Sequence, residues 1–186
     1  MDEKKINPAP LGLMGFGLTT VLLNMINADL LSSDALGIVL PMGIFYGGLA
    51  QIIAGLLEAK NGNTFGATAF SSYGLFWWSF VSMKILPSLG LVPEPSAVAV
   101  ASYLLAWGAF TVLMTAATFK GPKALQAVFI TLSLLFFILA AGDLTGSQEI
   151  KIIGGYEGIF CGLTAIYLAI AEILNETYGR TILPVG

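Results

Sequence analysis

The sequence predicts an all-α membrane protein, a bundle of six transmembrane helices with the N- and C-termini both in the cytoplasm. Composition is the first reason: the 186 residues are 56% hydrophobic and 10% charged, with a mean hydropathy of +0.86, whereas soluble domains carry roughly 25% charged residues. The second reason is a set of long apolar stretches. The third is the uneven distribution of basic residues between the connections.

Six segments approach the roughly twenty apolar residues that a helix needs to cross a bilayer. Polar or Pro/Gly-rich residues end each segment, and the connections are short. We therefore expect residues 1–186 to form a single transmembrane domain without a soluble domain. The expected spans are residues 10–26, 37–57, 65–86, 96–119, 124–141 and 153–174.

Basic residues indicate the orientation, since cytoplasmic loops carry an excess of lysine and arginine. With both termini inside, six basic residues lie in the cytoplasm and two, Lys84 and Lys151, lie outside. The charged tail, residues 1–5, is similar to the start of a signal peptide, but no small-residue cleavage site follows, so we expect it to be retained. This predicts a multi-pass protein of the cell membrane. The six basic residues placed in the cytoplasm are Lys4, Lys5, Lys60, Lys120, Lys123 and Arg180.

Several functions are disfavoured by residues that the chain lacks. It has no histidine and a single cysteine, Cys161, so it cannot form a disulfide within the chain, and we expect no metal site and no cofactor. A net charge of -3 without a basic stripe gives no reason to expect a nucleic-acid partner. No acid dyad or nucleotide-binding loop occurs in a plausible arrangement, so an enzyme is the least favoured class.

The first span opens with two prolines one residue apart. Proline fixes φ and lacks an N–H group, which suits the first turn of a helix, and Asn7 can cap that turn. We expect the amides and dipole of this helix start to favour an anion; a plain helix start at the membrane surface is the alternative. The motif is Asn7, Pro8, Ala9, Pro10, Leu11, Gly12 and Leu13.

Polar and aromatic side chains recur at helical spacing along one face of several spans, and such faces can line a solute path. Phe16, Thr20 and Asn24 follow one another at intervals of four residues. Polar side chains that face lipid are unfavourable, so we expect these to point into the bundle. For each one taken singly, a hydrogen bond between helices is the alternative. Further residues on these faces are Gln51, Ser72, Tyr73, Trp77, Leu132, Glu157, Ala165 and Glu172.

The charges favour one kind of solute. No arginine occurs within a span, and Lys84 lies at a helix end, where it can extend to the surface. A dianion would therefore bind with its charge poorly compensated. A small weak acid, with a pKa near the roughly 4.3 of a glutamate side chain, fits better. It can cross in its neutral form or as an anion with a proton, and the sequence favours neither.

Several blocks of sequence carry a resemblance to a known family. They are residues 7–13, 15–17 (Gly-Phe-Gly), 43–51 (Gly-Ile-Phe-Tyr-Gly-Gly-Leu-Ala-Gln), 62–66 (Gly-Asn-Thr-Phe-Gly), 72–74 (Ser-Tyr-Gly) and 174–181 (Leu-Asn-Glu-Thr-Tyr-Gly-Arg-Thr). They resemble the acetate uptake transporter family over nearly the whole chain. The resemblance implies six transmembrane helices per subunit, a homo-hexamer with one path through each protomer, and transport of acetate, with succinate or other short monocarboxylates as further substrates.

The resemblance also implies an apolar constriction at Phe16, Tyr73 and Leu132, and a role for Ala165 in setting substrate size. In our hypothesis these three side chains form the narrowest gate, where the Tyr73 hydroxyl meets a passing carboxylate. Ala165 leaves room beside Leu132. Two carboxylates are candidates for proton handling, with solvation at a helix end as the alternative. The hydrogen-bonding stations are Thr20, Asn24, Gln51 and Ser72, and the two carboxylates are Glu157 and Glu172.

Transport can be proton-coupled or channel-like, and two other functions stay open. One is a passive channel for small neutral solutes, because Asn7-Pro8-Ala9 matches the aquaporin triplet; however, aquaporins need that triplet twice and it occurs here once. The other is a non-transporting assembly subunit that binds a partner through glycine-rich helix faces.

Overall fold

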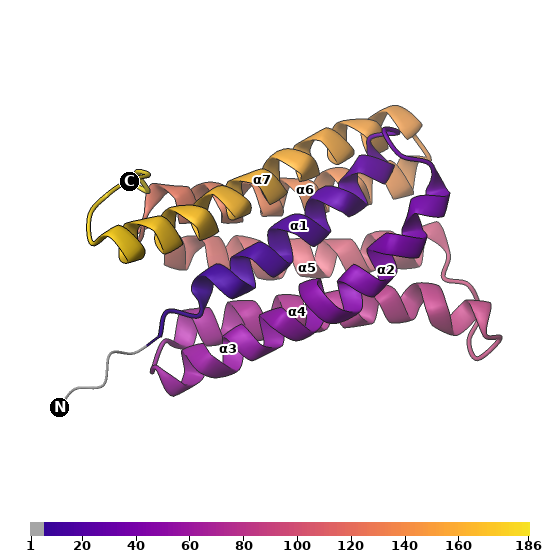
Figure 1. The fold of residues 1–186 in the computed structure, drawn as a ribbon. Helices are drawn as coiled ribbons and strands as arrows, with labels where there is room; N and C mark the ends of the chain where they lie inside the picture. The colour runs from indigo at the N-terminus through magenta and orange to yellow at the C-terminus, as the bar shows by residue number, and fades with distance from the viewer. Residues whose placement is uncertain (1–5) are drawn as a thin grey trace.

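A computed structural model of the chain describes residues 6–186, so the predicted retained tail lies outside the described residues. The described part is helical, without strands (Figure 1). A π-helical turn, η2 (Phe45–Ala50), joins α2 to α3, and a short 3-10 turn, η1 (Ser33–Ala35), precedes α2. The α-helices are α1 (Ala9–Asn27), α2 (Leu36–Ile44), α3 (Gln51–Lys60), α4 (Thr64–Ser88), α5 (Ala97–Thr118), α6 (Lys123–Thr145) and α7 (Gln148–Tyr178).

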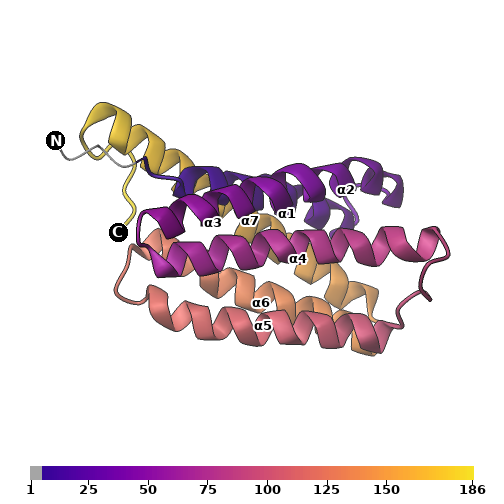
Figure 2. The ribbon, with the colours of Figure 1, turned by 90° about the horizontal axis from the view of Figure 1, so that it is seen from below.

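These helices confirm the predicted all-α membrane fold. Elements η1 to α3 form one segment, Ser33–Lys60, so the described residues contain one helical segment for each predicted span. Five of the segments are long and apolar enough to cross a membrane. The remaining one, α4, is more polar because it carries several serines and Lys84. The start of α1 and the C-terminus lie at the same end of the bundle (Figures 1 and 2).

The second span differs from the regular helix that its apolar pattern predicts. Its α-helical geometry gives way to a π turn at Phe45, a few residues after Pro41, which lies inside α2. The Trp78 indole Nε1 donates a hydrogen bond of 2.8 Å to the Ile44 carbonyl. This bond satisfies a backbone acceptor at the point where the regular ladder of hydrogen bonds changes.

Each helix of the bundle packs closely against the next one, except along one side, where the backbones are farther apart and side chains fill the gap. The order of contact is α5, α6, α7 and α1, followed by the η2–α3 segment and then α4 (Figure 2). Aromatic rings of α4 close the remaining gap against α5 and α6: ring centroids are 5.7 Å apart for Phe76 and Tyr103 of α5, and 5.3 Å and 6.1 Å apart for the α4–α6 pairs Phe76–Phe136 and Tyr73–Phe129. The interior between α4 and α6 is therefore lined by side chains.

Glycines bring α1 and α7 into close contact. A Cβ placed on Gly162 would lie 2.8 Å from the Gly17 carbonyl oxygen, and a Cβ on Gly155 would overlap the backbone of Ala28. Such contacts allow helices in a membrane to approach closely. They fix the position of α1, whose opposite face points into the bundle.

We predict that Gly155→Ala destabilises the protein by roughly 1–3 kcal/mol, because the new methyl group has no space beside the Ala28 backbone. Gly37→Ala is the control: a Cβ there meets nothing within 4 Å, so the change is neutral or stabilising by at most about 1 kcal/mol. The measurement is the midpoint of thermal denaturation in detergent. Equal midpoints for the two variants would contradict the described α1–α7 contact.

Candidate functional site

Two cavities lie in the interior of the bundle. Cavity 1, of about 470 Å³, is lined by residues of α1, α3, α4, α6 and α7 and includes Asn7 and Glu172, near the termini. Cavity 2, of about 300 Å³, includes Asn27 and Lys84, at the opposite end of the helices. The two cavities therefore extend toward opposite ends of the bundle.

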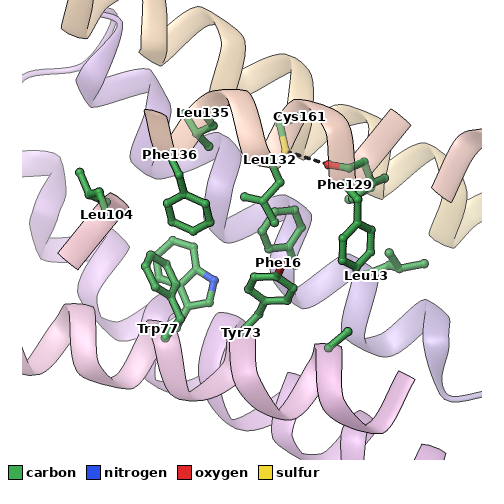
Figure 3. Packing of buried hydrophobic residues seen from close by; sticks show 14 of the residues in the cluster. Leu13, Phe16, Tyr73, Trp77, Leu104, Phe129, Leu132, Leu135, Phe136 and Cys161 are labelled. Atoms are coloured by element: carbon green, nitrogen blue, oxygen red, sulfur yellow. Dashed lines mark hydrogen bonds between the residues drawn. The ribbon is translucent and has the colours of Figure 1, made fainter. Parts of the chain in front are cut away.

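Phe16 and Leu132 line both cavities and separate one from the other. Tyr73 lines cavity 1 beside them, with its ring centroid 6.3 Å from that of Phe16. In Figure 3 Leu132 points down from α6 toward the Phe16 and Tyr73 rings. All three side chains are at most 6% exposed. The structure thus brings the three residues of the predicted constriction together, and we call this group the neck.

The Tyr73 hydroxyl is already engaged within the protein. It lies 2.9 Å from the Thr111 Oγ1, and that Thr111 hydroxyl donates its own proton to the Trp107 carbonyl at 2.7 Å. Thr111 can therefore only accept from Tyr73, so Tyr73 is the donor. The expectation that this hydroxyl is free to donate to a passing carboxylate does not match the geometry. The Tyr73 ring contacts Phe16, while its hydroxyl is held by Thr111.

The predicted hydrogen-bonding stations divide into two groups. Thr20 lines cavity 2 and Gln51 lines cavity 1, and the Thr20 Oγ1 and Gln51 Oε1 are buried without a partner among the described residues. Buried polar atoms almost always have a partner, so these two are available to water or a solute. Asn24 lines cavity 2, but its amide is used: Nδ2 donates to the Thr20 carbonyl and Oδ1 accepts from Asn27, both at 2.9 Å.

Ser72 and Ala165 line neither cavity. Ser72 is half-buried on α4, next to Tyr73 in the sequence. Ala165 is fully buried in the same hydrophobic cluster as Leu132. A larger side chain at position 165 would therefore press on the packing around the neck without touching a solute directly.

Two asparagines organise the mouth of cavity 1. The N-cap position of α1 is Pro8 and not the predicted Asn7, but the Asn7 Oδ1 accepts the Ala9 N–H at 3.1 Å, and its Nδ2 donates to a Glu172 carboxylate oxygen at 2.9 Å. Asn63 repeats this pattern at the start of α4, where Nδ2 donates to Glu58 at 2.9 Å and Oδ1 accepts a backbone N–H at 3.1 Å. Each asparagine thus joins a helix start to a carboxylate of another helix.

The expected anion site at the start of α1 is wrong. The Ala9 N–H is taken by Asn7, Pro10 has no N–H, and the Leu11 N–H donates to the Pro8 carbonyl at 3.1 Å. No amide of the first three residues is left for a solute. Moreover, carboxylates line this mouth, and an anion would be repelled by them.

Sequence reasoning also missed groups at the other end. Lys84 lines cavity 2, so the expectation that the path leaves the charge of a dianion poorly compensated does not hold at this end. Lys151 lines it too, in an ion pair of 2.7 Å with Asp143. Trp77 is 2% exposed and lines the same cavity, and its Nε1 has no partner among the described residues. Its position four residues after Tyr73 was the signal for this placement.

Glu157, one of the two carboxylates that the sequence suggests for proton handling, lies outside the cavities. Both of its carboxylate oxygens are buried without a hydrogen-bond partner among the described residues, and it lines neither cavity. Within residues 6–186, no group of three or more potential metal ligands among His, Cys, Asp and Glu comes together. Glu157 therefore lies on α7 outside both cavities, with its carboxylate buried and without a hydrogen bond within the described residues.

Apolar helices that enclose two opposed cavities, separated by a neck of three side chains, define a multi-pass membrane transport protein. The chain belongs to the GPR1/FUN34/yaaH family, which it matches over residues 1–185. This confirms the resemblance drawn from the sequence blocks.

Similar proteins have names that refer to transport. The chain is 54% identical to the succinate-acetate/proton symporter SatP of Escherichia coli K12, over 100% of this chain and 97% of that protein. It is 36% identical to acetate permease A of Emericella nidulans, over 99% and 67%. A solved structure of the bacterial acetate channel SatP superposes with a TM-score of 0.96 at 54% identity, covering 98% of this chain and 100% of that one.

We predict that Asn7→Asp lowers stability by roughly 1–3 kcal/mol at neutral pH. The aspartate still accepts the Ala9 N–H, but it places a second carboxylate within hydrogen-bond distance of Glu172. Adding Glu172→Gln restores a donor and should recover most of the loss. Denaturation midpoints in detergent measure both effects. An unchanged midpoint for the single variant, or no recovery in the double variant, would show that this contact does not organise the mouth.

Proposed function

We propose that this chain transports acetate, with succinate and other short monocarboxylates as further substrates, along a path inside each protomer. The observation that carries the proposal is the pair of cavities that extend toward opposite ends and share Phe16 and Leu132. The names of the relatives, which refer to acetate and succinate, supply the substrate class. The proposed activity is transport and not catalysis.

In this proposal the neck is the barrier to flux. Phe16, Tyr73 and Leu132 offer a passing carboxylate only apolar surface, and a charge that leaves water without a partner is strongly disfavoured. An acid that carries a proton crosses at much lower cost. Thr20 and Gln51, on either side, offer oxygen atoms to a protonated acid or to water. Asn24 and Ser72 contribute to the packing of the wall.

Substrate size would be set by the packing behind the neck. Ala165 belongs to the cluster that supports Leu132 and is fully buried. Its small side chain leaves Leu132 room to move away from Phe16 when a solute passes. A larger residue at position 165 would restrict that movement and favour the smallest acids.

We assign proton handling to Glu172 and Glu157. Glu172 lies at the mouth of cavity 1, where Asn7 donates to it. Glu157 is buried without a partner, and an unpaired carboxylate in a membrane helix is typical of a functional group. Both lie on α7, which packs against α1 and α6. A proton on either carboxylate would remove a negative charge from the surroundings of the path.

The proposal includes an orientation and an assembly. The single domain has both termini in the cytoplasm, as the excess of basic residues on that side favours, so cavity 1 opens to the cytoplasm. Assembly into a homo-hexamer follows from the family resemblance. It would cover part of the exposed apolar surface, which includes Phe45, Leu113 and Phe160 at 58% exposure or more.

The neck predicts the outcome of radiolabelled acetate uptake into proteoliposomes. Phe16→Ala or Leu132→Ala should raise the acetate flux by roughly tenfold, as expected if the barrier falls by about 1.4 kcal/mol, and should admit bulkier acids such as butyrate. Leu134→Ala is the control, because that side chain lies on the same helix at 50% exposure. If both neck variants keep the wild-type flux and size range, the assignment of the gate fails.

Proton coupling predicts a separate result. Uptake driven by an inward proton gradient should lose most of its stimulation in Glu157→Gln and Glu172→Gln, while acetate exchange at equal pH continues. Glu149→Gln, on the exposed start of α7, serves as the control. Wild-type uptake that ignores the gradient and does not saturate would instead favour a channel without coupling.

A further inference from the structure

Cavity 2 contains a cation that the protein itself does not neutralise. Lys84 is exposed at the mouth of this cavity and has no ion pair or hydrogen bond within the described residues. Lys151 lines the same cavity, but Asp143 holds its ammonium group at 2.7 Å. The positive charge that faces an incoming solute is therefore that of Lys84.

Deeper in the same cavity lie two donors without partners. The Trp77 Nε1 and the Thr20 Oγ1 are both buried, and each residue is only 2% exposed. An indole N–H can only donate, so the Trp77 nitrogen needs an acceptor. In Figure 3 this nitrogen lies on the edge of the ring that faces Phe16, at the neck. A carboxylate oxygen in cavity 2 would satisfy it.

Trp77 and Lys84 lie on the same face of α4. Tyr73, Trp77 and Lys84 lie on the face that lines the two cavities in turn, and seven residues, about two turns, separate the indole from the ammonium group. At 1.5 Å per residue this is roughly 10 Å. Since Lys84 lies at the mouth and Trp77 next to the neck, an entering carboxylate meets the two groups one after the other.

We propose that cavity 2 is a carboxylate-binding vestibule, in which Lys84 captures the anion at the mouth and the Trp77 N–H, with the Thr20 hydroxyl, holds it next to the neck. This inference rests on the proposed transport function and assigns its anion-binding end. Cavity 1 supports the assignment by contrast: Glu58 and Glu172 line it, and among residues 6–186 no lysine or arginine does. The two ends of the path therefore treat an anion differently.

The test is acetate exchange in proteoliposomes with equal acetate concentrations on both sides, which samples both mouths whatever the orientation of insertion. At about 0.01 M ionic strength, Lys84→Gln should raise the KM for acetate about threefold, as expected when a unit charge roughly 7 Å away in water is lost. The inhibition constant of succinate, a dianion, should rise about tenfold, because its interaction with the same charge is twice as large. Both shifts should disappear at about 1 M salt.

The controls separate charge from structure. Lys84→Arg should keep wild-type values, and Lys60→Gln, an exposed lysine at the end of α3 near cavity 1, should change neither constant. Equal constants for Lys84→Gln and Lys60→Gln at low salt would overturn the capture role. Equal rises for acetate and succinate would also overturn it, since a packing defect does not scale with the charge of the solute. Wild-type exchange itself tests the transport function separately.

A second variant tests the inner donor. Trp77→Phe retains an aromatic ring but removes the N–H group, and it should raise the KM for acetate roughly tenfold at both salt concentrations, the loss expected for a hydrogen bond to a charged acceptor. Trp78→Phe is the matched control, because its indole donates to the Ile44 carbonyl and not into the cavity. An unchanged KM in Trp77→Phe would overturn this part of the vestibule.

Discussion

The contact of Phe16, Tyr73 and Leu132 at the centre of the bundle is the constraint on which the rest of the structure depends. The three side chains come from α1, α4 and α6, and these helices must be held at fixed distances for the contact to form. Glycine contacts between α1 and α7 fix one side, and edge-to-face contacts of aromatic rings between α4 and α6 fix the other. Packing that is usual in a membrane bundle thus serves to separate two cavities.

Polar groups in the interior follow a simple division. Those needed for the fold have partners: Tyr73 with Thr111, Asn24 with Asn27, and Asn7 with Glu172. Those that border the cavities close to the neck, Thr20 and Gln51 among them, have free atoms. Since an unpaired polar atom is costly in a low-dielectric interior, a solute or water that passes through provides the missing partner. Charge then distinguishes the ends, with carboxylates at one mouth and a free ammonium group at the other.

The sequence predicted the helices well because each apolar stretch is long and clearly bounded, and helical spacing correctly grouped Phe16 with Thr20 and Asn24. It could not show the π turn at Phe45, which depends on a bond from Trp78 on another helix. Nor could it show that the amides at the start of α1 are occupied, since this depends on the orientation of the Asn7 side chain. Lys84 is exposed at a helix end, as its position predicts, but spacing alone does not reveal that this helix end adjoins a cavity.

The central claim, that the neck separates two cavities open to opposite sides, is tested most directly by the reactivity of single cysteines. In a Cys161→Ala background, which removes the one native thiol, Ala69→Cys places a thiol in cavity 1 and Thr20→Cys places one in cavity 2. A membrane-impermeant thiol reagent should modify position 69 only from the side of the termini and position 20 only from the other side. Modification of both positions from the same side, or of neither from any side, would contradict the account.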